Sequence, residues 1–515
     1  MVYRPGCNGV VATRVALTAR LQCRVLAFGP FTLDLRTYVL SKDGAMVPLS
    51  PKLVQVLACL AEARGELVTR ELLLDRYWPS LTVTDNTLTR ALADIRKVLD
   101  DNPATPDYIQ TLARRGYRFV APVRSESAVP DAAQVGIVAI TPAFSGLEPF
   151  IAWERGRTAL ESLSVGALPE AAEAFSRAVT GAPQYAPAHA GLANAHVFRY
   201  EATRVDNEPD LEALTAAIGA ATRATTLDPT MGEGWAALGH ALANAGRGED
   251  ARAALRQALA LEPRNWRHHY RMAVCAWGEE RLRAVERAEA LLPGFAGTQI
   301  LSAMVLIARQ AFDFARDAAG RGAAAQATQH DHTLYPGNGL LWLRGLTAAA
   351  RGQRAAALDD FRAEAIFSTH ATTVYAREGL VLSREAEGFT LLGLGDAAGA
   401  RGAFAEANAA SPGHARALLG LAVADGASGQ AVERVAAACA TLAQAGKHGE
   451  HALVVAAAQA WAGDADAGVA HAEGALTGAW ADSTGWSLPA DPMFAPLRGA
   501  PGYPRLLARL SSRAS

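Results

Sequence analysis

The chain has 515 residues, of which half are hydrophobic and 19% are charged, so it can bury a large core. Its five cysteines are scattered and form no CxxC pair, which argues against a disulfide framework and a cysteine-based zinc site. The apolar runs Val135–Ile140 and Ile300–Ala308 are well short of the roughly 20 residues that span a bilayer. The short, interrupted apolar run near the N-terminus does not fit a signal peptide. We therefore expect a cytoplasmic protein without a membrane contact.

The formal net charge of −2 conceals an asymmetry along the chain. Residues 1–124 hold 17 Lys and Arg against 11 Asp and Glu, whereas residues 125–515 hold 32 against 40. The N-terminal part is therefore basic and the rest of the chain acidic. This distribution favours binding of a polyanion by the N-terminal part.

Composition and periodicity divide the chain into four segments. Residues 1–24 contain four arginines and no acid, and they lack periodicity, so we interpret them as a tail or a basic arm. Residues 25–123 mix short strands with helices. Residues 124–147 are rich in Ser, Ala and Pro and are interpreted as a linker. Residues 148–515 have helical periodicity throughout, so the predicted fold is mostly α.

The second segment begins with short β-rich stretches separated by turn residues. The expected strands are Val25–Phe28, Phe31–Asp34 and Tyr38–Leu40, with turns at Gly29-Pro30 and Lys42-Asp43-Gly44. This pattern predicts an antiparallel meander.

Three helices and a hairpin follow the meander. The first helix starts at Ser50-Pro51, a favoured cap and first position, and ends before Gly65. Thr69 caps a second helix, and a third runs from about Asp85 to Asp100. The segments Tyr108–Leu112 and Tyr117–Val120 form the hairpin. Strands, three helices and a terminal hairpin together predict an α+β winged helix-turn-helix domain.

The third helix has an apolar stripe and a polar face. Leu88, Leu92, Ile95 and Leu99 form the stripe. The opposite face carries Asn86, Thr87, Arg90, Ala91, Asp94 and Lys97. A helix that enters the major groove needs short polar side chains and Arg near its N-terminal half, although a solvated helix face would have a similar composition.

The hairpin tip carries Arg114 and Arg115 beside Gly116. Two adjacent guanidinium groups on a projecting tip suit phosphates or the narrow minor groove, although an ordinary soluble turn is the alternative. Thr111 could donate to a phosphate. Tyr117 is interpreted from its pattern as a core residue.

Residues 25–123 resemble the effector domains of the OmpR/PhoB-type winged-helix family. The resemblance is carried by Phe28-Gly29-Pro30-Phe31, Leu49-Ser50-Pro51-Lys52, Leu73 to Trp78-Pro79, Asn86-Thr87-Leu88-Thr89, Ile95-Arg96-Lys97-Val98-Leu99 and Arg114-Arg115-Gly116-Tyr117-Arg118-Phe119. It implies that the third helix contacts the major groove of double-stranded DNA and that the wing contacts the minor groove. It further implies that the loop Pro79–Thr84 contacts RNA polymerase and that the protein can bind as a homodimer.

The resemblance also assigns contacts residue by residue. It assigns the major groove to Asn86, Thr87, Arg90, Ala91 and Asp94, and the wing and backbone contacts to Thr111, Arg114, Arg115 and Tyr117. Ala91 departs from the family pattern, because relatives often have a polar side chain such as His at this position.

The last segment repeats with a period of 34 residues, which separates Asp228-Pro229 from Glu262-Pro263. Between them the tetratricopeptide pattern is Trp235, Leu238, Gly239, Ala251, Leu255, Ala258 and Pro263. The same offsets recur at Ala171, Phe175, Ala178 and Pro183, at Gly345, Ala357 and Phe361, and at Gly388, Ala400, Phe404, Ala407 and Pro412. Insertions near Arg204–Asp210 and Ala323–Gly339 interrupt the period, and Leu488–Leu510 is expected to close the array.

Such repeats predict an α-solenoid of helical hairpins with a concave inner face that binds proteins or peptides. Asn194, His240 and Asn244 are expected to point inward, where an Asn amide can hold a peptide backbone or carboxylate. Ordinary polar groove residues without a dedicated ligand are the alternative.

We found no catalytic motif in either domain. The chain has only four lysines and no P-loop, and it lacks a nucleophile elbow and an HExxH motif. The histidine pairs in His330-Asp331-His332 and His448-Gly449-Glu450-His451 are interpreted as surface histidines.

The sequence therefore predicts a DNA-binding transcription regulator that is not an enzyme and holds no cofactor or metal. Its repeats would bind a partner, self-associate or sense a signal. The alternative is a repeat scaffold whose N-terminal domain does not bind DNA.

Overall fold

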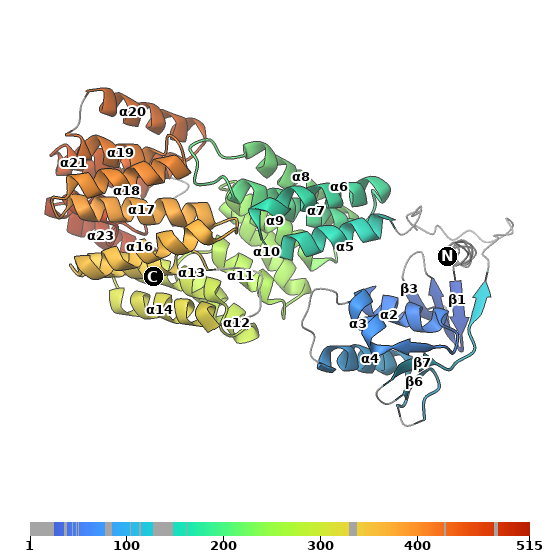
Figure 1. Cartoon of the computed structure of the whole chain (residues 1–515). Helices are drawn as coiled ribbons and strands as arrows, with labels where there is room; N and C mark the ends of the chain where they lie inside the picture. The colour runs from blue at the N-terminus through green and yellow to red at the C-terminus, as the bar shows by residue number, and fades with distance from the viewer. Residues whose placement is uncertain are drawn as a thin grey trace, which may run out of the picture. The chain divides into compact units, whose positions relative to one another are not determined.

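The computed structural model describes residues 25–126 and 148–515, apart from gaps at 35–38, 44, 48, 50, 78–84, 104, 113–114, 162, 329–336, 427–428 and 478–482. Two compact units, Met1–Leu147 and Glu148–Ser515, make up the chain (Figure 1). The expected tail at 1–24 lies outside the described residues.

The first unit begins with an antiparallel sheet of five strands in the order β4-β3-β2-β1-β8. The strands are β1 (Val25–Phe28), β2 (Phe31–Asp34), β3 (Val39–Lys42), β4 (Ala45–Val47) and β8 (Arg124–Glu126). The expected meander is thus confirmed. Strand β8 was expected to be linker, but it pairs with β1, with Val25 opposite Glu126. The sheet therefore extends three residues past the boundary expected at residue 123.

Three helices and a second sheet make up the rest of the described part of the first unit. The helices are α2 (Pro51–Glu62), α3 (Arg70–Tyr77) and α4 (Asp85–Leu99). Strands β5 (Leu67–Thr69), β6 (Ile109–Leu112) and β7 (Gly116–Phe119) form a sheet in the order β5-β7-β6. Thr69 caps α3 as expected, because its Oγ1 accepts a hydrogen bond from the Leu72 amide at 3.2 Å. This arrangement confirms the winged helix-turn-helix fold.

The wing hairpin is held close to β5 by a glycine. Gly116 has φ +141°, and a Cβ at this position would lie 2.2 Å from the carbonyl oxygen of Val68. Only glycine allows β7 to approach β5 this closely. On β7, Phe119 packs edge-on against Phe28 of β1 with ring centroids 5.0 Å apart, which joins the two sheets in one core.

The second unit is a solenoid of helices that pair in chain order, and Figure 1 shows neighbouring helices running side by side. The pairs are α5 (Glu148–Glu161) with α6 (Leu168–Gly181), α7 (Ala186–Glu201) with α8 (Leu211–Leu227), α9 (Gly232–Asn244) with α10 (Gly248–Leu261), α11 (Trp266–Cys275) with α12 (Gly278–Leu291), α13 (Ala296–Ala308) with α14 (Phe312–Thr328), α15 (Leu340–Ala350) with α16 (Arg354–His370), α17 (Ala376–Leu392) with α18 (Ala397–Ala410), α19 (Ala415–Ala424) with α20 (Gly429–Gln444), and α21 (His448–Trp461) with α22 (Ala465–Ala475). The predicted α-solenoid is confirmed.

The periodic glycines explain why the hairpins pack tightly. A Cβ added to Gly388 of α17 would lie 2.6 Å from the ring of Phe404 on α18. Gly345 stands in the same relation to Phe361, and Gly239 to Leu255. A small residue on the first helix thus receives the large residue of the second helix in three of the repeats recognised in the sequence.

The C-terminal segment packs back onto the solenoid. It contains the 3-10 helix η2 (Pro492–Gly499) and helix α23 (Tyr503–Ala514), whose Leu506 and Leu510 are fully buried. The Tyr503 hydroxyl donates to the Leu488 carbonyl at 2.9 Å, and Arg309, directly after α13, donates to the Ala514 carbonyl at 2.8 Å. The end of the chain is thus tied to a hairpin near the middle of the array.

Candidate DNA interface and solenoid cavity

Helix α4 buries the predicted stripe. Leu88, Leu92, Ile95 and Leu99 are each at most 2% exposed. Ala91 was expected on the outward face, but it is only 6% exposed and belongs to the same core. Its assignment to the groove-facing side is wrong, because a residue three positions after Leu88 lies next to it on a helix and its small side chain fits there.

The outward face of α4 carries Asp94 and Lys97, which are both exposed. Asn86, Thr87 and Arg90 belong to α4 by their backbone, but their side chains lie outside the described residues. The loop Pro79–Thr84 and Arg114 also lie outside them.

The wing presents Arg115, which is exposed and whose amide closes the hairpin turn by donating to the Leu112 carbonyl at 2.9 Å. Thr111 is exposed, and its Oγ1 accepts a hydrogen bond from Arg96 at 2.8 Å. Tyr117 is only 6% exposed, and its hydroxyl accepts a hydrogen bond from Arg70 at 3.3 Å. The interpretation of Tyr117 as a core residue therefore holds, and the backbone contact implied by the resemblance does not fit its burial.

A buried carboxylate that we did not identify from the sequence fixes the wing to α4. Asp101 is 6% exposed and accepts hydrogen bonds from the amides of Asp107, Tyr108 and Ile109 at 2.7, 3.0 and 2.9 Å. Arg96 of α4 lies 3.7 Å from Asp101 and donates to the Ile109 carbonyl at 2.8 Å. The end of α4 and the start of β6 are thus held in one geometry.

The solenoid contains a cavity of about 440 Å³. The first helices of successive hairpins supply much of its wall, including Phe198 of α7, Tyr270 of α11 and Trp342 of α15. Arg281 of the second helix α12 also lines it, and segments outside the repeat pattern add Arg204, Asn338 and Trp486.

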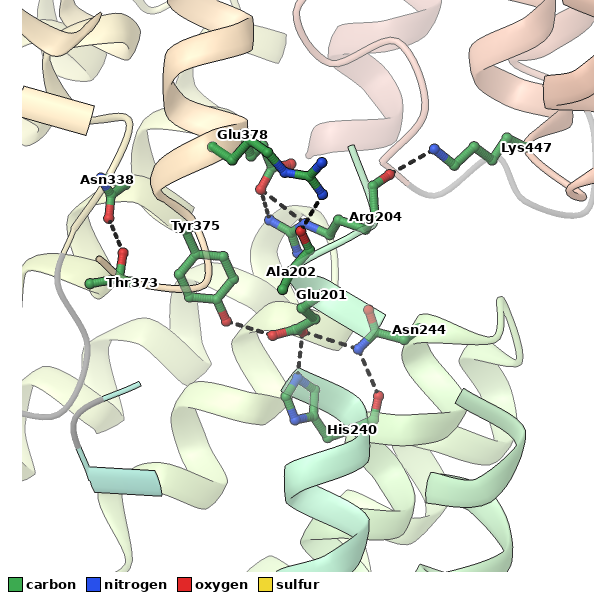
Figure 2. A network of polar contacts seen from close by, with 11 residues as sticks. Glu201, Ala202, Arg204, His240, Asn244, Asn338, Thr373, Tyr375, Glu378 and Lys447 are labelled. Carbon is green, nitrogen blue, oxygen red and sulfur yellow. Dashed lines mark hydrogen bonds and ion pairs between the residues drawn. The ribbon is translucent and has the colours of Figure 1, made fainter. Parts of the chain in front are cut away.

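The three residues expected to face the groove make hydrogen bonds within the solenoid. Nε2 of His240, which lines the cavity, lies 2.9 Å from Oε1 of Glu201, and the Asn244 amide donates to the same oxygen at 3.2 Å (Figure 2). The Asn194 amide donates to Glu233 at 2.8 Å, and its oxygen accepts from Arg271 at 3.2 Å. Internal partners thus occupy polar groups that we expected to hold a ligand.

Glu201 is the centre of a network that joins distant repeats. It is 3% exposed, and its second oxygen accepts a hydrogen bond from the Tyr375 hydroxyl at 2.6 Å (Figure 2). Burial raises the pKa of Glu201, but His240, Arg204 and the Tyr375 hydroxyl lower it more, to about 2. The carboxylate therefore stays ionised at neutral pH.

The insertion after α7 crosses to the later repeats. Arg204 donates to Glu378 of α17 through Nε at 3.0 Å and Nη2 at 2.5 Å, and Arg377 donates to Asp206. The Lys447 ammonium donates to the carbonyls of Arg204 and Asp206 at 2.7 and 2.6 Å. The segment that interrupts the 34-residue period thus ties α7 to α17 and to the start of α21.

Among the residues that the structure describes, no helix is long and apolar enough to cross a membrane. The pair His330 and His332 lies outside the described residues.

Two family models match the chain. Residues 44–119 match "Transcriptional regulatory protein, C terminal", a range that includes α4 and the wing. Residues 232–275 match "Tetratricopeptide repeat", a range that includes α9 to α11. These are models of a DNA-binding domain and of a repeat, and not of an enzyme family.

The chain is similar to known regulators over its N-terminal fifth. It is 32% identical over 104 residues to transcriptional activator CadC of Escherichia coli (strain K12), covering 20% of each chain. It is 38% identical over 109 residues to transcriptional regulatory protein KdpE of Mycobacterium tuberculosis (strain CDC 1551 / Oshkosh), covering 21% of this chain and 48% of that protein. The chain thus spans less than half of the length of these curated relatives.

A solved structure is similar over the same region. The RstA DNA-binding domain of Klebsiella pneumoniae, in complex with the RstA box, is 29% identical, with a TM-score of 0.18. The match covers 19% of this chain and 97% of that one.

Proposed function

From an N-terminal OmpR/PhoB-type winged-helix domain joined to a tetratricopeptide-repeat solenoid, we propose that this chain is a bacterial transcription regulator acting in the cytoplasm. The winged-helix domain binds promoter DNA, and the solenoid sets DNA occupancy by binding a protein partner, self-associating or sensing a signal. The observation that carries the proposal is the family match over residues 44–119, which includes both α4 and the wing. The 31 to 38% identity of this region to named transcription regulators supports it.

The proposal gives separate roles to the helix and the wing. Asn86, Thr87 and Arg90 contact base edges in the major groove from the N-terminal half of α4. Exposed Lys97 and the tip residues Arg114 and Arg115 neutralise phosphates or enter the minor groove.

Thr111 fits a phosphate contact. Its oxygen already accepts a hydrogen bond from Arg96, so the hydroxyl proton remains for a phosphate oxygen. The Asp101 and Arg96 contacts set the position of the wing relative to α4.

We further propose that the loop Pro79–Thr84 contacts RNA polymerase and that two copies of the protein bind adjacent DNA sites.

The test measures binding of the full chain to labelled genomic DNA fragments by fluorescence anisotropy in a salt series. We expect the logarithm of the binding constant to fall linearly with the logarithm of salt concentration, by about 0.9 for each phosphate neutralised. Arg115→Ala should weaken binding to all sequences and reduce the slope by about 1, whereas Arg90→Ala should weaken preference among sequences. Arg155→Ala removes a 60%-exposed arginine of the solenoid and is the matched control. Undetectable or salt-independent binding would refute the proposal.

One observation favours the alternative of a repeat scaffold. Asp94 is exposed on the face of α4 that would meet DNA, where a carboxylate repels phosphates unless it accepts from a cytosine amine. If the protein is a scaffold, Asp94→Asn should leave its protein partners unchanged. If the protein binds DNA, the same substitution should alter its affinity for DNA or its preference among DNA sequences. Recovery of the same protein partners by wild type and Asp94→Asn, with no DNA enriched by either, would support the scaffold.

A further inference from the structure

The solenoid cavity is partly walled by segments that the repeat pattern does not require. The insertion after α7 places Arg204 on its wall, the segment before α15 places Asn338 there, and the segment after α22 places Ser483 and Ser487 there. The ties from Arg204 and Asp206 to α17 and Lys447 hold the first of these segments across the solenoid. The space is therefore bounded on sides where a tetratricopeptide array would otherwise offer an open groove to an extended peptide.

The size and lining of this cavity suit a small organic molecule. Its volume of about 440 Å³ is within the range of small-molecule pockets, roughly 300–1,000 Å³. Much of its wall is aromatic or aliphatic, including Ile300, Met304, Trp342, Leu343, Leu382 and Trp486. The rings of Trp342 and Trp486 meet edge to face, with centroids 5.8 Å apart. A flat apolar ring system could therefore stack against aromatic side chains in this cavity.

Most cations on the cavity wall already have an anionic partner. Arg204 pairs with Glu378, Arg271 with Glu233, and Arg416 with both Glu385 and Asp491. These pairs compensate their own charges and do not require a ligand.

Arg281 of α12 differs from the other arginines of the wall. It is 4% exposed, and within the described residues its guanidinium donates to the carbonyls of Ala273, Val274 and Ala276 and to the Met304 sulfur. It also lies over the Trp277 ring at 4.7 Å. Among the described residues, no carboxylate lies within ion-pair distance of this group. Burial lowers the pKa of Arg281 to about 10, so the group is still a cation at neutral pH.

Arg281 has acceptors but no carboxylate partner, whereas another donor of the wall, on Trp342, lacks an acceptor altogether. The Trp342 Nε1 is buried and has no hydrogen-bond partner in the part of the chain that the structure describes. A buried cation without a counter-charge and a buried donor without an acceptor are both expensive in the absence of a ligand.

We propose that the solenoid cavity binds a small aromatic monocarboxylate, whose carboxylate pairs with Arg281 and whose ring system lies among the aromatic residues of the wall. One uncompensated cation matches one negative charge, whereas a phosphate dianion would leave a second buried charge without a partner. The inference rests on the proposed function only in that the ligand would be the signal that the regulator senses.

The experiment uses the full chain without DNA and two probes of the same shape, 1-naphthoate and the neutral 1-naphthamide, measured by isothermal titration calorimetry. Wild type should bind naphthoate at least about tenfold more tightly than naphthamide, which corresponds to about 1.4 kcal/mol. Arg281→Met keeps most of the side-chain length and removes the charge, so the two probes should then bind with equal affinity. Arg505→Met, on α23 and 76% exposed, should leave the ratio of the two affinities unchanged.

A second variant guards against a folding defect, because Arg281 also caps the carbonyls at the end of α11. Ser487→Phe keeps every charge and adds a ring to the half-buried wall, so it should abolish binding of both probes. The proposal is overturned if wild type binds neither probe, if it binds both equally, or if Arg281→Met leaves the ratio unchanged. This experiment contains no DNA, so its result does not depend on the DNA-binding test. If the chain binds naphthoate but fails the DNA-binding test, the proposed transcription regulator is refuted and the ligand site is not.

Discussion

The Tyr375 hydroxyl donates a hydrogen bond at 2.6 Å to a carboxylate oxygen of Glu201, a residue 174 positions earlier in the chain. Repeat arrays are held mainly by contacts between neighbouring repeats, so their parts can unfold separately. Here the bond links α7 directly to the start of α17, and the Arg204 and Lys447 contacts lie beside it (Figure 2). We therefore expect this solenoid to unfold more cooperatively than an array with neighbour contacts alone.

Replacing Tyr375 by Phe tests the contribution of that bond. The ring stays in place, but the buried Glu201 carboxylate loses one donor, so the free energy of unfolding in urea should fall by about 1–3 kcal/mol. Tyr200→Phe is the matched control, because the hydroxyl of this neighbouring tyrosine makes no hydrogen bond to the described part of the chain. Equal effects of the two variants would contradict a structural role for the Tyr375 hydroxyl.

The Arg204–Glu378 ion pair should also act on cooperativity. Its side chains are 37% and 23% exposed, so solvent screens the pair, and Arg204→Met should cost only about 1–2 kcal/mol. The more informative readout is hydrogen exchange, in which α17 should lose protection together with α7. Arg155→Met breaks an exposed pair within one hairpin, with Glu170, and should cost less than about 1 kcal/mol. Loss of protection confined to α7 would show that the tie does not couple the repeats.

Local patterns were sufficient for most of the fold. The stripe Leu88, Leu92, Ile95 and Leu99 predicted both the length and the buried side of α4, because a helix repeats every 3.6 residues. The repeat glycines and their large partners were recognisable for the same reason. Ala91 was assigned to the wrong face because it lies at the edge of the apolar stripe, and a small side chain is compatible with either the buried or the exposed face of the helix.

Long-range contacts could not be predicted from such patterns. The tie made by Arg204 joins residues separated by 174 positions, and in the sequence it showed only as an interruption of the period. Strands β5 and β8 have three residues each, too few to show alternation, and they exist because β7 and β1 offer free edges. Asp101 follows α4 in a run of aspartates, and nothing local separates it from its exposed neighbours.

Asp101 should be essential for the structure of the wing. Asp101→Asn replaces one carboxylate oxygen by an amide that cannot accept from the backbone, so at least one of three amides loses its charged acceptor. We expect the N-terminal unit to be destabilised by about 3 kcal/mol, with faster hydrogen exchange at the amides of Asp107, Tyr108 and Ile109. Asp107→Asn changes an exposed neighbour and should leave these amides protected. Unchanged exchange in Asp101→Asn would show that the carboxylate does not hold β6.

His414 should make the stability of the solenoid depend on pH above neutrality. The imidazole is 2% exposed, and its Nδ1 lies 2.5 Å from a carboxylate oxygen of the fully buried Glu385, while Glu450 lies 3.9 Å from Nε2. Burial lowers the pKa of His414, but Glu385 and Glu450 raise it more and outweigh Arg416, so the net pKa is raised above 6.5. The protonated imidazole therefore stabilises the fold fully below pH 6.5, and this contribution is lost as pH rises through the folded-state pKa.

The measurement is the free energy of unfolding in urea between pH 6.5 and 8.5, which should fall for wild type and change less for His414→Gln. His196 and His268 have pKa values lowered chiefly by burial, so they reduce stability as pH falls below 6.5 and do not act in this window. His471→Gln replaces an exposed histidine and should follow the wild-type profile. Parallel profiles for wild type and His414→Gln would mean that the Glu385 pair does not retain the proton in the folded chain.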